Sequence, residues 1–167
     1  MADPTAPWLD SEEQDAWRAF IGSVHDLMAA LEADLAEHGL TMGDYQVLVY
    51  LSEAEDHAMR MCDLAGHLQL SPSGVTRRLD GLVRAGLVAR QPSETDRRVM
   101  MAVLTDAGMA LLERAAPTHV RSVRHRLVDR VDRGDLLAMS RVFTSVREGL
   151  DGDEGCRAAR AVAMAVP

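Results

Sequence analysis

The residues best suited to bind another molecule lie close together in residues 63–79, whose second half is rich in hydroxyl and guanidinium groups. Ser71-Pro72 indicates a helix start, because serine is a favoured N-cap and proline fits the first helical position. If Val75 and Leu79 face inward, the polar groups near this start face outward, where free N–H groups of the helix also bind phosphate. In a helix-turn-helix this end of the second helix enters the major groove of DNA. The residues predicted to meet DNA here are Ser71, Ser73, Gly74, Thr76, Arg77 and Arg78.

A second group of basic residues follows in a predicted β-hairpin. Two short runs with strand-like composition, residues 87–91 and 99–104, flank a polar loop that carries Arg97 and Arg98. Arginine suits the narrow, electronegative minor groove of DNA. We therefore predict that Arg97 contacts DNA, whereas Arg98 is as suited to an internal salt bridge with Asp96 as to DNA.

The elements that must position these arginines form a compact set. Residues 62–68 predict a short helix, and Ala65 supplies the small residue that a helix-turn-helix needs where its second helix crosses the first. Thr41 is placed to cap another helix, which precedes residues 62–68 in the chain. Two helices followed by a hairpin are the order of a winged helix-turn-helix, so we assign residues 41–104 as a DNA-binding module.

Long helices are predicted on both sides of this module. An apolar stripe with steps of three and four indicates a helix over about residues 11–38, with Ser11 and Gln14 as a capping box and Gly39 as its stop. Residues 105–150 show similar stripes, and Pro117 predicts a kink or break within them. These stripes are longer than one small module can bury, which predicts that a second copy of the chain covers them.

The fold class predicted from these elements is mainly α: a winged helix-turn-helix with a small β-hairpin wing, flanked by long N- and C-terminal dimerisation helices. Residues 1–150 form the domain, with 11–38 and 105–150 as the dimerisation helices. Residues 151–167 are assigned as a tail, either disordered or a loosely docked helix.

Residues 63–90, the Asp96-Arg97-Arg98 tip and residues 103–108 (Val-Leu-Thr-Asp-Ala-Gly) resemble the MarR family of bacterial transcription regulators, over about residues 12–150. The resemblance implies a homodimer that binds near-palindromic double-stranded DNA; the lack of a secretory signal pattern and the small number of cysteines favour a cytoplasmic protein. It also implies a repressor that a small aromatic or phenolic effector releases from DNA. By that resemblance the effector site lies between the dimer helices and the DNA-binding module, where the candidate residues are Trp17, His25, Met28, Met42, Tyr45 and Arg90.

Each effector candidate also has a plainer interpretation. Trp17 and Met28 fit the apolar stripe, and Met42 and Tyr45 fit ordinary packing. Arg90 is also placed to brace the wing. His25 is better explained as an interface histidine than as an effector contact.

Composition limits the other functions. The net charge is −8, yet all 18 basic residues are arginine and seven of them lie in residues 60–98, which favours one directed phosphate-binding face over a generally basic surface. There is no apolar run long enough to span a membrane, no secretory signal pattern and no catalytic motif, so we expect neither a membrane partner nor an enzyme. The scattered histidines and two cysteines predict no metal site or cofactor, and Cys62 is expected to be buried and inert.

One alternative remains at this stage. A winged-helix module could instead bind a protein or a small molecule without binding DNA. Such a surface would carry aromatic or aliphatic groups. The start of the predicted second helix carries hydroxyl groups and arginines, which favours DNA.

Overall fold

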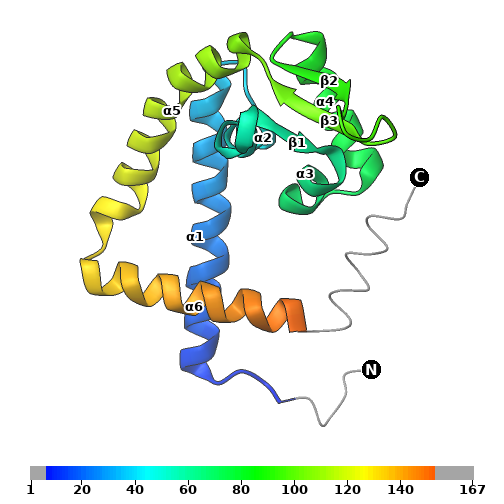
Figure 1. Cartoon of the computed structure of the whole chain (residues 1–167). Helices are drawn as coiled ribbons and strands as arrows, with labels where there is room; N and C mark the ends of the chain where they lie inside the picture. The colour runs from blue at the N-terminus through cyan, green and yellow to red at the C-terminus, as the bar shows by residue number, and fades with distance from the viewer. Residues whose placement is uncertain (1–6, 153–167) are drawn as a thin grey trace.

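The computed structural model describes residues 7–152, which form a mainly helical molecule with a small antiparallel sheet at one end (Figure 1). The predicted fold class is confirmed. In chain order the elements are α1 (Ser11–Ala36), α2 (Met42–Glu53), the short 3₁₀ helix η1 (Glu55–His57), β1 (Ala58–Arg60), α3 (Met61–Leu68), α4 (Pro72–Arg84), β2 (Val88–Pro92), β3 (Met100–Leu104), α5 (Asp106–Arg126), η2 (Val128–Arg130) and α6 (Arg133–Gly152).

The sheet contains one strand that the sequence did not predict. The strand order of the sheet is β1-β3-β2. The predicted hairpin consists of β2 and β3, and β1 pairs with the other edge of β3, with Ala58 opposite Val103 and Arg60 opposite Met101. A three-residue strand is too short to show an alternating pattern in the sequence. Its pairing with β3 stabilises it, and this strand brings α3 directly beside the wing.

The core lies almost wholly inside the module and the adjoining end of α1. The largest fully buried side chains belong to Leu35, Val47, Leu48, Leu51, Leu64, Val75, Leu79 and Val88. Val75 and Leu79 therefore face inward, as predicted, and Ala65 is also buried at the place where α3 meets α4. Burial of one face of α4 fixes which of its residues point to solvent.

The start of α5 is fastened to the segment between α4 and β2. The Thr105 hydroxyl lies 2.7 Å from the Gly86 carbonyl oxygen and 3.0 Å from that of Leu87, and the Thr105 N–H donates to Leu87 (3.1 Å). A Cβ atom on Gly108 would lie only 2.1 Å from the Leu87 carbonyl oxygen. Only glycine allows α5 to approach this closely, so the module and α5 meet at a tightly packed point.

The predicted N-terminal cap of α1 was wrong. The N-cap of α1 is Asp10, whose carboxylate accepts from the Glu13 N–H while the Glu13 carboxylate accepts from the Asp10 N–H, each at 2.9 Å. This reciprocal pair replaces the predicted Ser11 cap, because a carboxylate is favoured at a helix N-terminus. Gly39 does end the turn after α1, with φ +71°.

At Pro117 we predicted a kink or break, and the structure shows no break. The helix α5 runs without a break from Asp106 to Arg126. Proline removes one backbone hydrogen bond. Packing of α5 against α1 holds the helix on both sides of it: Ala115 and Ser122 are buried, and the His38 ring lies 3.0 Å from the Thr118 hydroxyl.

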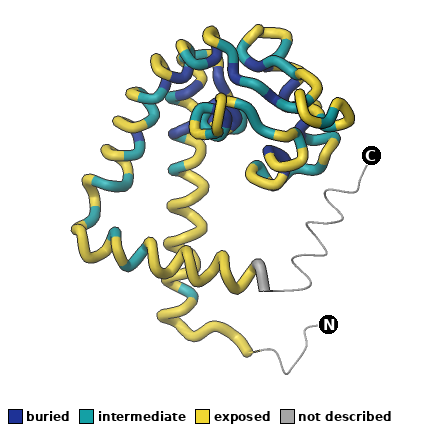
Figure 2. Tube along the Cα trace, viewed as in Figure 1, coloured by how far each residue is buried: buried dark blue, intermediate teal, exposed yellow. Residues whose placement is uncertain are grey.

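The apolar stripes of α1 and α6 are exposed. Figure 2 shows that the half of the molecule distant from the sheet is almost entirely solvent-accessible. The two helices touch there through Phe20 and Phe143, whose ring centroids are 5.5 Å apart. The large exposed apolar side chains of this surface, which we call the terminal apolar face, are Trp17, Phe20, Ile21, Val24, Met28, Leu137, Val142, Phe143, Val146 and Leu150. Residues 151–152 of the predicted tail belong to the end of α6, and residues 153–167, with Cys156, lie outside the described residues.

Candidate nucleic-acid interface

The N-terminal turn of α4 has the predicted capping geometry. The Ser71 hydroxyl accepts from the Gly74 N–H at 3.0 Å and lies 3.1 Å from the Ser73 hydroxyl. Thr76 is exposed, and its hydroxyl donates to the Pro72 carbonyl at 2.8 Å. A Cβ atom at Gly74 would lie 3.1 Å from the Ser71 oxygen, so glycine keeps this turn compact. The helix start is thus capped by its own side chains, and it is partly or fully exposed to solvent.

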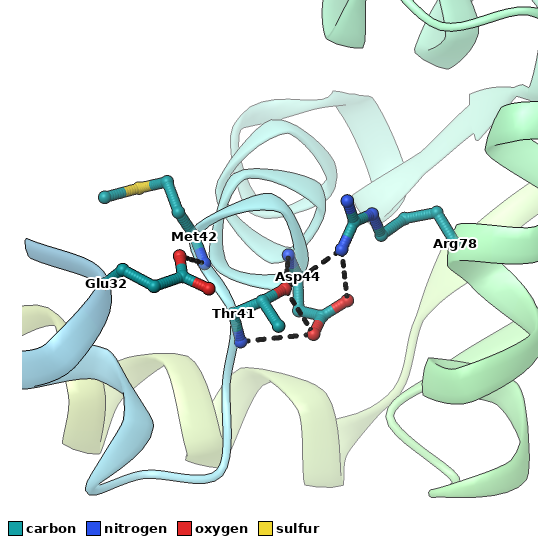
Figure 3. A network of polar contacts seen from close by, with 5 residues as sticks. All are labelled: Glu32, Thr41, Met42, Asp44 and Arg78. Atoms are coloured by element: carbon teal, nitrogen blue, oxygen red, sulfur yellow. Dashed lines mark hydrogen bonds and ion pairs between the residues drawn. The ribbon is translucent and has the colours of Figure 1, made fainter. Parts of the chain in front are cut away.

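The two arginines of this helix are placed differently. Arg77 is exposed, and it forms no ion pair with any residue that the structure describes. Arg78 instead turns toward the start of α2, where its Nη1 donates to the Thr41 hydroxyl (3.0 Å) and lies 3.5 Å from Asp44 Oδ1 (Figure 3). The role of Asp44 was not predicted from the sequence, although Thr41 and Asp44 have the spacing of a capping box.

The wing carries a similar pair. Arg97 is exposed and likewise forms no ion pair within the described chain, whereas Arg98 Nε lies 3.2 Å from Asp96 Oδ1. Hydrogen bonds from the side chain and the backbone N–H of Arg98 lower the pKa of Asp96. The Arg98 side chain is still 91% exposed. The internal salt bridge therefore forms without removing this guanidinium from the surface.

Arg90 connects the wing to α4. Its Nη1 donates to Asp80 Oδ1 at 2.8 Å, and its Nη2 donates to the Thr76 carbonyl at 2.6 Å. This is the wing-bracing geometry, one of the two roles that the sequence suggested for Arg90. Because the brace ends beside Thr76 and Arg77, the wing and the exposed face of α4 are held in one orientation.

The other effector candidates are spread over several parts of the molecule. Trp17 lines an apolar hollow between α1 and α6, next to Phe20, and His25 and Met28 lie further along α1, both exposed. Met42 and Tyr45 lie on α2 and pack against the core. A single copy of the chain therefore does not gather the six residues at one place.

Tyr45 has a neighbour that the sequence did not single out. Its ring centroid lies 4.6 Å from that of His119 on α5. Burial raises the pKa of Tyr45 and lowers the pKa of His119. His119 Nδ1 is buried without a hydrogen-bond partner among the described residues, so the folded chain favours the neutral imidazole.

The expectation that Cys62 is buried was wrong. The side chain is exposed at the start of α3, and its thiol lies 3.4 Å from Asp63 Oδ1. The inward positions of this short helix are taken by Leu64 and Ala65 instead. Within residues 7–152, no group of His, Cys, Asp and Glu side chains is arranged to hold a metal ion, and no helix is both long and apolar enough to cross a membrane.

A helix-turn-helix with a braced, arginine-tipped wing defines a winged-helix protein, and comparison with known proteins names the family. The model of the MarR family matches residues 38–99. The crystal structure of AbsC, a MarR family transcriptional regulator from Streptomyces coelicolor, superimposes with a TM-score of 0.86 at 39% identity and covers 89% of this chain and 100% of AbsC. The chain belongs to the MarR family.

Two further transcription regulators are similar to this chain. Sco3205, a MarR family regulator from Streptomyces coelicolor solved in complex with DNA, gives a TM-score of 0.84 at 32% identity and covers 89% of this chain and 93% of that one. The transcriptional repressor YetL from Bacillus subtilis is 33% identical over 93 residues, 56% of each chain. The chain spans about half the length of curated relatives such as YetL.

Proposed function

We propose that this chain is a sequence-specific DNA-binding transcription regulator that acts as a homodimer on near-palindromic operators. One observation carries the proposal: Arg77 on α4 and Arg97 on the wing project from one braced module without acidic partners in the described chain. Guanidinium groups read guanine edges in the major groove and bind phosphates or the minor groove beside it. We place Ser71, Ser73, Gly74, Thr76 and Arg98 at the same interface.

The terminal apolar face supports a dimer. Soluble monomers rarely expose a contiguous apolar surface of this extent, and such surfaces mark contacts with another molecule. A second copy brings an identical face, which a two-fold axis makes self-complementary. Two modules related in this way would meet half-sites about one helical turn apart, roughly 10 base pairs.

Regulation by a small molecule forms a second part of the proposal. The hollow beside Trp17 lies between α1 and α6, the helices of the terminal apolar face, and the Tyr45–His119 pair joins α2 of the DNA-binding module to α5. An aromatic acid that binds at either of these places would favour one arrangement of the two subunits. If that arrangement misplaces the α4 helices, the protein is released from DNA. This makes the chain a ligand-responsive repressor, working in the cytoplasm where its DNA lies.

The test is selection of genomic DNA fragments by the purified protein, followed by measurement of affinity against salt concentration. We expect a defined set of fragments and an affinity that falls steeply with salt, since each neutralised phosphate releases counterions. Arg77→Ala should cost roughly 1–3 kcal/mol at particular bases. Arg114→Ala, an exposed arginine on α5, serves as the matched control. Selection of no DNA by the wild type would favour the protein-interaction alternative.

Small aromatic acids are then screened for release of the selected DNA. The proposal predicts that at least one releases the wild-type protein at a concentration that leaves its thermal stability unreduced. Release by unfolding alone, or no release by any aromatic acid, would remove the ligand-responsive part and leave the DNA-binding part intact.

A further inference from the structure

The N-terminus of α2 is a junction between three helices. The carboxylate of Glu32 on α1 accepts from the N–H of Met42, the first residue of α2, at 2.6 Å. Four N–H groups at a helix start lack partners within the helix, so this bond ties α2 to α1 at the point where a partner is needed. On the other side of the same turn, Arg78 reaches across from α4 (Figure 3).

The turn holds the Arg78 guanidinium with several groups at once. The Asp44 carboxylate accepts from both the N–H (3.2 Å) and the hydroxyl (2.6 Å) of Thr41, and the same hydroxyl accepts from Arg78. The side chains of Arg78 and Asp44 are only 35% and 21% exposed. A half-buried guanidinium with a hydroxyl and a carboxylate in reach is fixed more firmly than an exposed ion pair.

Gly43 provides the space for this contact. A Cβ atom there would lie 2.6 Å from Arg78 Cζ, 2.8 Å from Nη2 and 3.0 Å from Nε. The guanidinium therefore lies flat against the backbone of α2, at a distance that only glycine permits. The φ angle of Gly43 is not in the left-handed region, so no conformational demand explains this glycine.

We propose that Arg78 is a positioning residue rather than a DNA contact: held by Gly43, Thr41 and Asp44, it fixes α4 relative to α1 and so sets the distance between the two α4 helices of a dimer. The proposal rests on the proposed function. Successive base pairs differ by about 3.4 Å in rise and about 34° in rotation. An α4 helix fixed to the dimer helix accepts one half-site spacing, whereas a loosened helix accepts several.

The experiment uses the full chain and a duplex library with randomised central bases. Wild-type protein should select one palindrome with one half-site spacing. Gly43→Ala should displace the guanidinium while improving the helix propensity of α2, since alanine is the better helix former. We expect this variant to select the same half-site but to bind spacings one base pair longer or shorter about threefold to tenfold better, relative to the optimum, than wild type does.

Two further variants make the outcome decisive. Arg78→Ala should broaden the spacing to the same extent, and the double variant Gly43→Ala/Arg78→Ala should be no broader, because both changes break one contact. Gly66→Ala, a helical glycine on α3 with open space around it, should leave the spacing unchanged.

Each contrary result has its own meaning. A single unchanged spacing in both Gly43→Ala and Arg78→Ala, with thermal melting showing folded proteins, overturns the positioning role. Loss of one base preference inside the half-site in Arg78→Ala also overturns it, since Arg78 would then read DNA. Failure of the wild type to select any DNA would instead overturn the proposed function.

Discussion

Replacing Arg90 with alanine tests whether the wing depends on its brace to α4. The change removes the bond to the Thr76 carbonyl and the ion pair with Asp80. A bond from a charged donor contributes about 1.5 kcal/mol, and the ion pair, with Asp80 50% exposed, about 0.5 kcal/mol. The free energy of unfolding should therefore fall by about 2 kcal/mol, and Tm by about 6 °C.

The assay is urea denaturation followed by circular dichroism, combined with DNA affinity at fixed salt. Arg98→Ala is the matched control for stability alone, because its pair with Asp96 is local and its side chain is 91% exposed, so we expect almost no change in the free energy of unfolding. At a temperature where both wild type and Arg90→Ala are folded, the variant should still bind DNA more weakly, because its wing is no longer held against α4. Equal stability of Arg90→Ala and Arg98→Ala would refute the brace.

Three other outcomes follow from the structure. Val146→Asp places a charge on the exposed terminal apolar face, so sedimentation should show a monomer; a persistent dimer would place the interface elsewhere. Because burial lowers the pKa of His119 below its ordinary value of 6.5, the unfolded chain binds more protons as the pH falls through that value. The unfolding free energy should therefore fall on acidification, and less so in His119→Phe, as urea titrations would reveal. Gly108→Ala would force apart α5 and Leu87 and lower the unfolding free energy by about 2 kcal/mol or more; an unchanged urea midpoint would contradict that contact.

Local signals predicted the module well because they are short-range. The Ser71 cap, the inward Val75 and Leu79, and the hairpin each depend on neighbours in sequence. The start of α1 was predicted with Ser11 as its cap, whereas the neighbouring Asp10 caps it; both residue types favour this position, and only the hydrogen bonds distinguish them. Pro117 does not break α5, because tertiary packing outweighs one missing backbone hydrogen bond.

The candidate site was predicted in its residue types but not in their partners. Arg77, Arg78, Arg97 and Arg98 are alike in sequence, yet two are free of ion pairs in the described chain and two are held by carboxylates. The contact of Arg78 spans more than 30 residues of chain, from α4 back to α2, so no spacing rule reveals it. Exposure of Cys62 depends likewise on which face of the short α3 meets α4.

The anchoring of α5 at Thr105 and Gly108 gives the module a pivot. The helix α4 has 13 residues, so its DNA-facing end lies about 20 Å from the end that adjoins this anchor. A tilt of about 10° around that point carries the far end through about 3.5 Å, the height of one base-pair step. A tilt of this size at the anchor would therefore shift the DNA-facing end of α4 by one base-pair step along the duplex. No bond inside the module would have to break.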